Sequence, residues 1–334
     1  MKAIGCVKAK SNDEINPLVD LELPRPKPTG HDLLVEIKAI AVNPVDFKTR
    51  KRVQLQEGER RILGWDASGI VKEIGEQVSV FKPGDEVWFA GDITRPGCYS
   101  EFTLVDERIT GWKPKTLSFE QAAALPLTSI TAWELLFDRL NITANQKGSL
   151  LIIGAAGGVG SILVQLAKRL TELTIIGTAG REESLKWIKN NGADYVIDHK
   201  EPLLQQLEKQ GIGEVDYVIG LTHSAEHVEE IVNCLKPQAK FALIDDPDQL
   251  DFRIFKLKSI SIHWEMMFTR SMYKTPDMST QHRILTQVAE LVDKELIQTT
   301  LNDHFGVINS ANLTRAHELL ISGKSRGKIV LSGF

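Results

Sequence analysis

A glycine-rich segment stands where a buried strand would end and a helix would begin. The apolar run 150–153 is followed at once by Gly154-Ala155-Ala156-Gly157-Gly158-Val159-Gly160, and a helical apolar pattern starts there. Strand, glycine turn and helix is the context of a dinucleotide-binding fingerprint, although Ala155 stands in its first glycine position. The first helical amides lack partners within the helix, and the helix dipole favours an anion there. We therefore predict a pyrophosphate site formed by Ala156, Gly157, Gly158, Val159 and Gly160.

The residues about 20 positions further on distinguish the two nicotinamide dinucleotides, because sites for NAD usually carry Asp or Glu there to bind the ribose 2′-hydroxyl. This chain has Ala179, followed by Gly180 and Arg181. A missing carboxylate removes repulsion against a 2′-phosphate, and Arg181 could bind that phosphate bidentately, with His199 closing the same pocket. We predict NADPH as the cofactor. The alternatives are a solvent-exposed ion pair of Arg181 with a neighbouring glutamate and a surface or capping role for His199.

The elements that must position these residues follow two different patterns. From about residue 118, helical patterns alternate with short apolar strand candidates at 150–153, 173–178, 195–198, 215–219 and 240–244. Such alternation predicts an α/β Rossmann fold with a doubly wound parallel sheet. Before residue 118, apolar residues of period 2 and frequent turn signals predict a small antiparallel barrel or sandwich.

Composition limits the class of protein and of partner. The 334 residues correspond to roughly two domains at about 150 residues each. Hydrophobic residues make up 42% and charged residues 25%, which excludes disordered and collagen-like chains. A net charge of −4 is a poor match to nucleic acid, and no apolar run reaches the roughly 18 residues of a membrane span. Three isolated cysteines fit a reducing compartment, so we expect a cytoplasmic protein without a membrane partner.

Several motifs carry a resemblance to a known family. They are the glycine loop and the segments 42–46 (Val-Asn-Pro-Val-Asp), 63–71, 81–87, 125–133 and 192–198. Together they resemble the medium-chain dehydrogenase/reductase superfamily, and within it the quinone oxidoreductase branch, including bacterial proteins called zinc-type alcohol dehydrogenase-like. The resemblance implies a GroES-like β-barrel catalytic domain at residues 1–122, completed by the tail 264–334, and a Rossmann NADPH-binding domain at 123–263. It also implies a homodimer.

The zinc ligands of the family have no counterparts in this chain. Where zinc-dependent relatives carry a ligand cysteine, this chain has Asn43, and where they carry a ligand histidine it has Trp65. The third ligand position, near 127–128, holds no cysteine, and Cys98 alone lies in the region of their cysteine-rich lobe. A catalytic zinc needs three protein ligands. We therefore predict that no metal is bound.

The resemblance also implies site residues in the N-terminal part. Asn43 and Asp46 match positions near the nicotinamide ribose and the substrate, and Thr128 matches a cofactor contact; we take these three as the catalytic candidates. The alternative for Asn43 and Asp46 is a helix cap followed by a first-turn acid, and that for Thr128 is a helix N-cap. Trp65 is expected to fill the emptied metal cavity or to contact substrate.

Further candidates come from the later part of the chain. Trp264 and Phe268 belong to an apolar segment that suits a core or subunit interface, with substrate lining as a second use. Thr222, Arg326 and Lys328 are candidates for cofactor contacts, the last two toward the phosphates by family analogy. The alternative for Arg326 and Lys328 is a solvated basic turn.

Together these features predict a zinc-independent, NADPH-dependent reductase that transfers hydride to quinones or α,β-unsaturated carbonyls. Such acceptors place negative charge on an oxygen that hydrogen-bond donors can stabilise. One alternative is a zinc-dependent alcohol dehydrogenase. Another is a non-catalytic NADPH-binding protein that senses redox state, which stays open because no tyrosine near residues 43–51 offers itself as a proton donor.

Overall fold

The computed structural model describes residues 1–9, 11 and 15–334. Their contacts form two compact units: residues 1–130 with 268–334 (unit 1), and residues 131–267 (unit 2). None of the helices among the described residues combines the length and apolar character needed to cross a bilayer. The domain boundaries inferred from the sequence stay a prediction.

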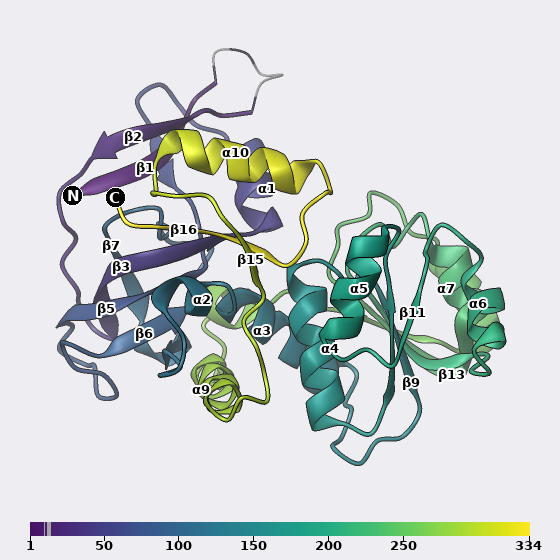
Figure 1. Cartoon of the computed structure of the whole chain (residues 1–334). Coiled ribbons are helices and arrows are strands. Elements are labelled where there is room, and N and C mark those ends of the chain that lie inside the picture. The colour runs from purple at the N-terminus through teal and green to yellow at the C-terminus, as the bar shows by residue number, and fades with distance from the viewer. Residues whose placement is uncertain (10, 12–14) are drawn as a thin grey trace. The chain divides into compact units, whose positions relative to one another are not determined.

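Unit 1 is built on β-sheets whose pairs are mainly antiparallel (Figure 1). The larger sheet has the order β15 (Leu301–His304), β16 (Lys328–Ser332), β3 (Asp32–Val42), β5 (Ala67–Ile74), β6 (Glu86–Phe89) and β8 (Thr110–Trp112), with β7 (Phe102–Asp106) also paired to β3. The smaller sheet has the order β2 (Leu18–Glu22), β1 (Lys2–Val7) and β4 (Arg60–Ile62). Among the described residues no pairing joins β15 to β8, so the expected closed barrel is not confirmed.

Strand β16 and the helix α1 (Pro44–Arg52) position the polar residues of unit 1. Strand β16 pairs antiparallel with β3, with Ile329 opposite Val42, and this register brings Lys328 to the end of β3. Helix α1 (Pro44–Arg52) starts there with proline at its first position, an acid in its first turn and basic residues in its last turn, as the helix dipole favours. The other helices of this part are η1 (Glu107–Ile109), α2 (Phe119–Ala123), α8 (Thr269–Met272), α9 (Thr280–Asp293) and α10 (Ser310–Ile321), whereas α3 (Pro126–Trp133) begins in unit 1 and ends in unit 2.

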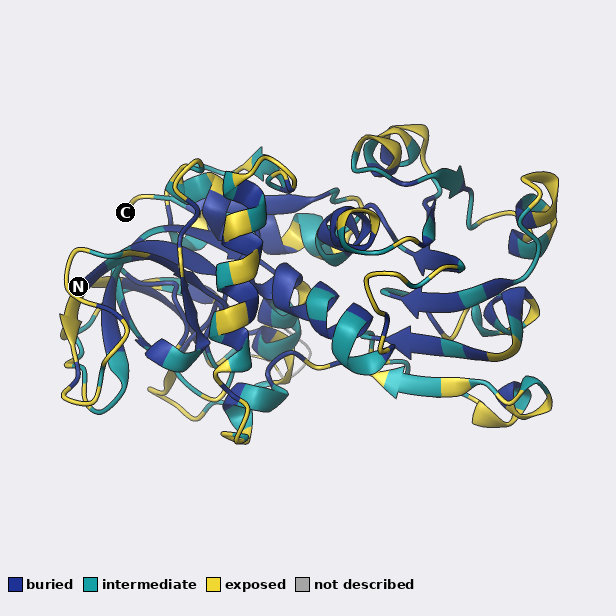
Figure 2. Cartoon of the chain, turned by 90° about the horizontal axis from the view of Figure 1, so that it is seen from below, coloured by how far each residue is buried: buried dark blue, intermediate teal, exposed yellow. Residues whose placement is uncertain are grey.

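Unit 2 confirms the expected doubly wound sheet. All of its strand pairs are parallel, in the order β11 (Tyr195–Ile197), β10 (Thr174–Thr178), β9 (Ser149–Ile153), β12 (Val215–Gly220), β13 (Leu235–Leu243) and β14 (Ser261–Trp264). This is the Rossmann order, whose direction reverses beside β9, where such folds bind ligands. The helices are η2 (Glu134–Arg139, a π-helix), α4 (Gly158–Leu170), α5 (Glu182–Asn190), α6 (Leu203–Lys209), α7 (Val228–Cys234) and η3 (Phe252–Lys258). The inner strands β9, β10 and β12 are mostly buried, whereas the helices α5, α6 and α7 expose one side (Figure 2).

Candidate functional site

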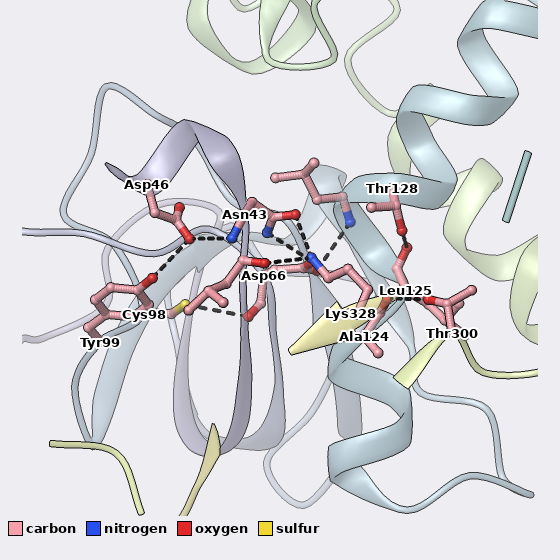
Figure 3. Close-up of polar contacts among 12 residues, drawn as sticks. Asn43, Asp46, Asp66, Cys98, Tyr99, Ala124, Leu125, Thr128, Thr300 and Lys328 are labelled. Carbon is pink, nitrogen blue, oxygen red and sulfur yellow. Dashed lines mark hydrogen bonds and ion pairs between the residues drawn. The ribbon is translucent and has the colours of Figure 1, made fainter. Parts of the chain in front are cut away.

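A buried ion pair lies beside the start of α1 in unit 1 (Figure 3). The Lys328 Nζ atom donates to Asp66 Oδ2 at 2.9 Å, to the Asn43 side-chain oxygen and to the Val42 carbonyl at 3.1 Å. The Asn43 Nδ2 atom also donates to Asp66 Oδ2, at 3.1 Å. The side chains of Lys328 and Asp66 are 3% and 0% exposed, respectively. The side-chain amide of Asn43 is therefore held by an internal ammonium and carboxylate.

The charges of this group depend on one another. Burial raises the pKa of Asp66, and the Lys328 ammonium opposes that rise. The second oxygen of Asp66 accepts from the Leu127 backbone N–H at 3.1 Å, so both oxygens of the carboxylate are bonded. Buried charges persist in proteins when they are paired and hydrogen-bonded, and this pair meets both conditions.

A second buried group contains Asp46. Its Oδ2 atom accepts from the Asn43 backbone N–H at 2.8 Å and from the Tyr99 hydroxyl at 2.9 Å (Figure 3). The Tyr99 oxygen lies 3.2 Å from His317 Nε2, and His317 Nδ1 lies 3.5 Å from Arg50 Nη1. Burial raises the pKa of Asp46 to about 7. Burial together with the Arg50 charge lowers the pKa of His317 to about 3. A carboxyl with a pKa near neutrality can exchange a proton under ordinary conditions.

The other candidates in unit 1 are packed or bonded to the chain. Trp65 is buried and meets Phe268 edge to face, with ring centroids 6.3 Å apart, and its indole N–H has no partner among the described residues. Thr128 is buried in α3 and donates to the Leu125 carbonyl at 3.1 Å. The Arg326 guanidinium bonds the Asn302 side-chain oxygen at 3.3 Å. Lys328 is predicted to contact the cofactor phosphates. In the structure its ammonium donates to Asn43 and Asp66, and the contact with phosphates stays a prediction.

The glycines of the loop in unit 2 differ in how closely other atoms pack around them. A Cβ atom on Gly160 would lie 2.5 Å from the Ala155 backbone, and one on Gly154, where φ is +79°, would lie 2.7 Å from Thr222 Cγ2. Thr222 thus lies against the loop. A Cβ on Gly157, the N-cap of α4, would meet only the Gly154 carbonyl, at 3.6 Å. Gly157 therefore leaves its side of the loop open at the positive end of α4, where a pyrophosphate is favoured.

This difference gives a prediction on stability. Gly160→Ala should lower the free energy of unfolding by about 1–3 kcal/mol, since backbone atoms must move to admit the methyl group. Gly157→Ala should change it by less than about 0.5 kcal/mol, since the new contact is ordinary. Urea unfolding of both variants tests the pair, and equal losses would contradict the distinction.

A group of basic side chains surrounds Gly180, after the end of β10. A Cβ on Gly180 would lie 2.7 Å from Lys200 Cε and 2.8 Å from His199 Nε2. The rings of His199 and His227 lie 5.6 Å apart, and desolvation lowers the pKa of both histidines. Arg181 is exposed at the start of α5, directly after buried Ala179. Lys200 and His227 were not among the predicted residues, although Lys200 adjoins His199 in the sequence.

Trp264, the remaining candidate of unit 2, ends β14 and is 49% exposed. The structure thus groups the glycine loop with Thr222, and His199 with Gly180. In unit 1 it groups Asn43 with Asp46, and Trp65 with Phe268. The residues that the sequence analysis missed in unit 1 are Arg50, Asp66, Tyr99 and His317.

The donor set of unit 1 does not fit a zinc ion. Among the described residues no group of three His, Cys, Asp or Glu side chains is arranged to hold a metal. Burial raises the pKa of the Cys98 thiol, which opposes the thiolate form that binds zinc. Its sulfur lies against the Asp66 backbone carbonyl, at 3.7 Å. The Asp66 carboxylate is already bound by the Lys328 cation.

Two family models match the chain: the alcohol dehydrogenase GroES-like domain at residues 29–115 and the zinc-binding dehydrogenase at residues 191–331. A zinc-type alcohol dehydrogenase-like protein of Staphylococcus epidermidis is 38% identical over 337 residues, covering 99% of each chain. A solved structure from Rhizobium etli CFN 42, of a candidate zinc-dependent alcohol dehydrogenase, is 50% identical over 100% of this chain and 98% of its own, with a TM-score of 0.95.

The fold is also that of the Escherichia coli quinone oxidoreductase solved in complex with NADPH, which is 24% identical over 100% of both chains, with a TM-score of 0.82. The relative from Staphylococcus epidermidis establishes the family on sequence, and the two family models agree with it. The chain therefore belongs to the medium-chain dehydrogenase/reductase superfamily, together with the proteins called zinc-type alcohol dehydrogenase-like, and is an oxidoreductase of that superfamily.

Proposed function

We propose that the protein is a zinc-independent reductase that uses NADPH to reduce quinones or α,β-unsaturated carbonyl compounds. The observation that carries the proposal is the position of Lys328, whose ammonium binds both Asn43 and Asp66. A zinc ion at this place would have to displace the Lys328 ammonium. Its ligand at position 43 would be an amide and not a thiolate. Such a site offers no metal to bind an alkoxide, which an alcohol dehydrogenase of the zinc type requires.

Conjugated acceptors suit the chemistry that is left. Bound NADPH would supply a hydride, and the acceptor would place the resulting charge on its own oxygen. The chain would then need to orient the acceptor and to stabilise or protonate that oxygen. Asn43, Asp46 and Thr128 are the residues proposed for this part, with Trp65, Phe268 and Trp264 for the acceptor's apolar surface. The named activity of the Escherichia coli relative supports this acceptor class.

The groups around Gly180 support NADPH over NADH. Ala179 provides no carboxylate for a ribose 2′-hydroxyl, and Arg181, Lys200 and His199 bring positive or donor groups to the same turn. A 2′-phosphate is a strong acceptor for such donors. The open glycine loop would bind the pyrophosphate part, as the sequence also predicts, and Thr222, a predicted cofactor contact, lies against this loop.

Replacing two of these basic groups tests the cofactor preference. Arg181→Ala with Lys200→Ala should weaken NADPH binding by about 10- to 100-fold, because both residues are exposed and solvent screens their charges, so that together they should contribute about 1.4–2.8 kcal/mol. NADH binding should change less than about twofold. Titration of nicotinamide fluorescence measures both, with Lys186→Ala on the exposed surface of α5 as the control. Equal weakening of both cofactors would contradict the assignment.

We also propose an assembly state, a division into domains and a cellular location for the protein. The sequence resemblance supports a homodimer and the domain division 1–122 with 264–334 and 123–263. All three cysteines are free and buried, which is compatible with the expected cytoplasmic location. Analytical ultracentrifugation measures the assembly state directly.

Steady-state rates test the proposed function. The purified protein is given NADPH or NADH with an o-quinone or an alkyl enone. We expect at least one acceptor to be reduced, with NADPH preferred by about tenfold or more. Oxidation of alcohols in place of these reductions would identify a dehydrogenase, and tight NADPH binding without turnover by either acceptor would identify a binding protein.

A further inference from the structure

The hydrogen-bond chain behind Asp46 runs in one direction. A guanidinium only donates, so His317 accepts from Arg50 at Nδ1. A neutral imidazole then carries its proton on Nε2, which donates to the Tyr99 oxygen. The Tyr99 hydroxyl is therefore left to donate its own proton to Asp46 Oδ2.

All the bonds that reach the Asp46 carboxyl fall on one of its two oxygens. Oδ2 accepts both from Tyr99 and from the Asn43 backbone N–H. Oδ1 is buried and has no partner among the described residues, and in Figure 3 no contact is drawn to it. When the carboxyl is protonated, its proton thus belongs on Oδ1, with no acceptor supplied by the described part of the chain. A buried donor without an acceptor is expected to serve a ligand or a water molecule.

We propose that Asp46 is the catalytic acid that protonates the acceptor's oxygen, with Tyr99 and His317 as positioning residues that keep the acidic proton on Oδ1. This assignment rests on the proposed reductase function. It also fills the gap left by the sequence, which showed no tyrosine near residues 43–51. Tyr99 reaches Asp46 from a segment 53 positions away.

For an enone, the proposed step transfers one hydride and one proton to the acceptor. Bound NADPH would supply a hydride, with its two electrons, to the β-carbon. The electron pair of the C=C bond would then form a new double bond to the carbonyl carbon, and an electron pair of the C=O bond would move to the oxygen to give an enolate. The Oδ1–H bond of Asp46 breaks, the proton joins that oxygen, and the enol becomes the ketone in water. Asp46 is left as a carboxylate and takes a new proton from solvent. Each turnover consumes one NADPH and one proton.

The charges around Asp46 agree with this role. The pKa of Asp46 is about 7, because desolvation and the Asp66 charge raise it by more than the Asn43 N–H, the Tyr99 hydroxyl and the Lys328 ammonium lower it. Burial keeps the neighbouring Cys98 thiol and Tyr99 hydroxyl protonated by raising their pKa values. An acid with a pKa near the working pH is the most effective proton donor.

Two acceptors with different needs for acid provide the test. The enolate formed from an alkyl enone is the more basic of the two anions, whereas the monoanion formed from an o-quinone delocalises its charge into the ring and depends less on a proton donor. We expect Asp46→Asn to lower kcat for the enone by about 100-fold or more, and for the quinone by less than about tenfold. Damage to the fold would lower both rates alike, so the ratio of the two rates separates the two causes.

The pH dependence supplies a second readout. With the enone, kcat/KM should fall as pH rises through about 7, because the carboxyl loses its proton. Tyr99→Phe removes a bond that favours the carboxylate, so this falling limb should move to higher pH. Thr110→Val, which removes a buried hydroxyl bonded to the Asp106 carbonyl, should move neither the limb nor the ratio.

The outcomes separate this inference from the function on which it rests. If the wild-type protein reduces neither acceptor, the proposed function fails and the acid role fails with it. If the protein is an active reductase but Asp46→Asn lowers both rates equally, or leaves the enone rate unchanged, the acid role alone is overturned. Reduction of the quinone alone by the wild type would also overturn it. A selective loss of enone reduction together with a shifted limb in Tyr99→Phe supports it.

Discussion

Replacing Lys328 by methionine is expected to lower the free energy of unfolding by about 3–5 kcal/mol. The variant keeps most of the side-chain volume but removes the cation, which leaves the fully buried Asp66 carboxylate without its compensating charge. The Asn43 side-chain oxygen and the Val42 carbonyl lose their donor at the same time. Urea unfolding followed by tryptophan fluorescence at pH 7 measures the loss.

A double variant shows whether the loss arises from the unpaired charge. Asp66→Asn combined with Lys328→Met removes both charges, and it should recover more than half of the lost stability. Lys236→Met is the matched control, since that lysine pairs with Asp216 near the surface and such pairs contribute at most about 1 kcal/mol. A loss below about 1 kcal/mol for Lys328→Met would contradict the buried ion pair.

Asp46→Asn is expected to change the pH dependence of stability. The pKa of Asp46 is about 7 in the folded protein, against an ordinary value of 3.8. Between these values the unfolded chain releases a proton that the folded protein retains, so the free energy of unfolding falls as pH rises. As the pH rises from 5 to 8, this carboxyl group should lower the free energy of unfolding of the wild type by about 2.5 kcal/mol.

Asparagine has no such proton, so the Asp46→Asn variant should not show this loss. Between pH 5 and pH 8, its free energy of unfolding should therefore rise by about 2.5 kcal/mol relative to that of the wild type. Chemical unfolding of both proteins at the two pH values measures this difference. The exposed Asp248 supplies the control, and Asp248→Asn should give the same difference from wild type at both pH values. A constant difference for Asp46→Asn would mean that the carboxyl is ionised throughout this range.

Local patterns were enough to predict most of unit 2. A Rossmann strand is short and apolar, its helix follows at once, and the glycine loop between them is contiguous, so neighbouring residues carry the whole signal. The order of the parallel sheet then follows from the general rules for such folds. Lys200 and His227 were missed because their closeness to Gly180 and His199 depends on loops that have no periodic pattern.

Unit 1 was harder to predict because its site depends on distant pairings. Lys328 meets Asn43 only through the register of β16 against β3, and Tyr99 meets Asp46 across 53 residues. No spacing rule joins such positions, and a lone lysine near the C-terminal end has the pattern of a solvated turn. Asp66 had a usable signal, since it follows Trp65 in a segment that resembles the metal-binding stretch of relatives. A charged residue in an apolar strand environment requires a partner of opposite charge.

The most direct test of a zinc-independent reductase is metal content measured together with turnover. The protein is produced in zinc-supplemented medium, analysed for bound metals, and assayed for NADPH oxidation by an o-quinone before and after treatment with a chelator. We expect zinc far below one ion per chain and the same rate after chelation. One zinc ion per chain, with activity lost on its removal and restored on its return, would contradict it.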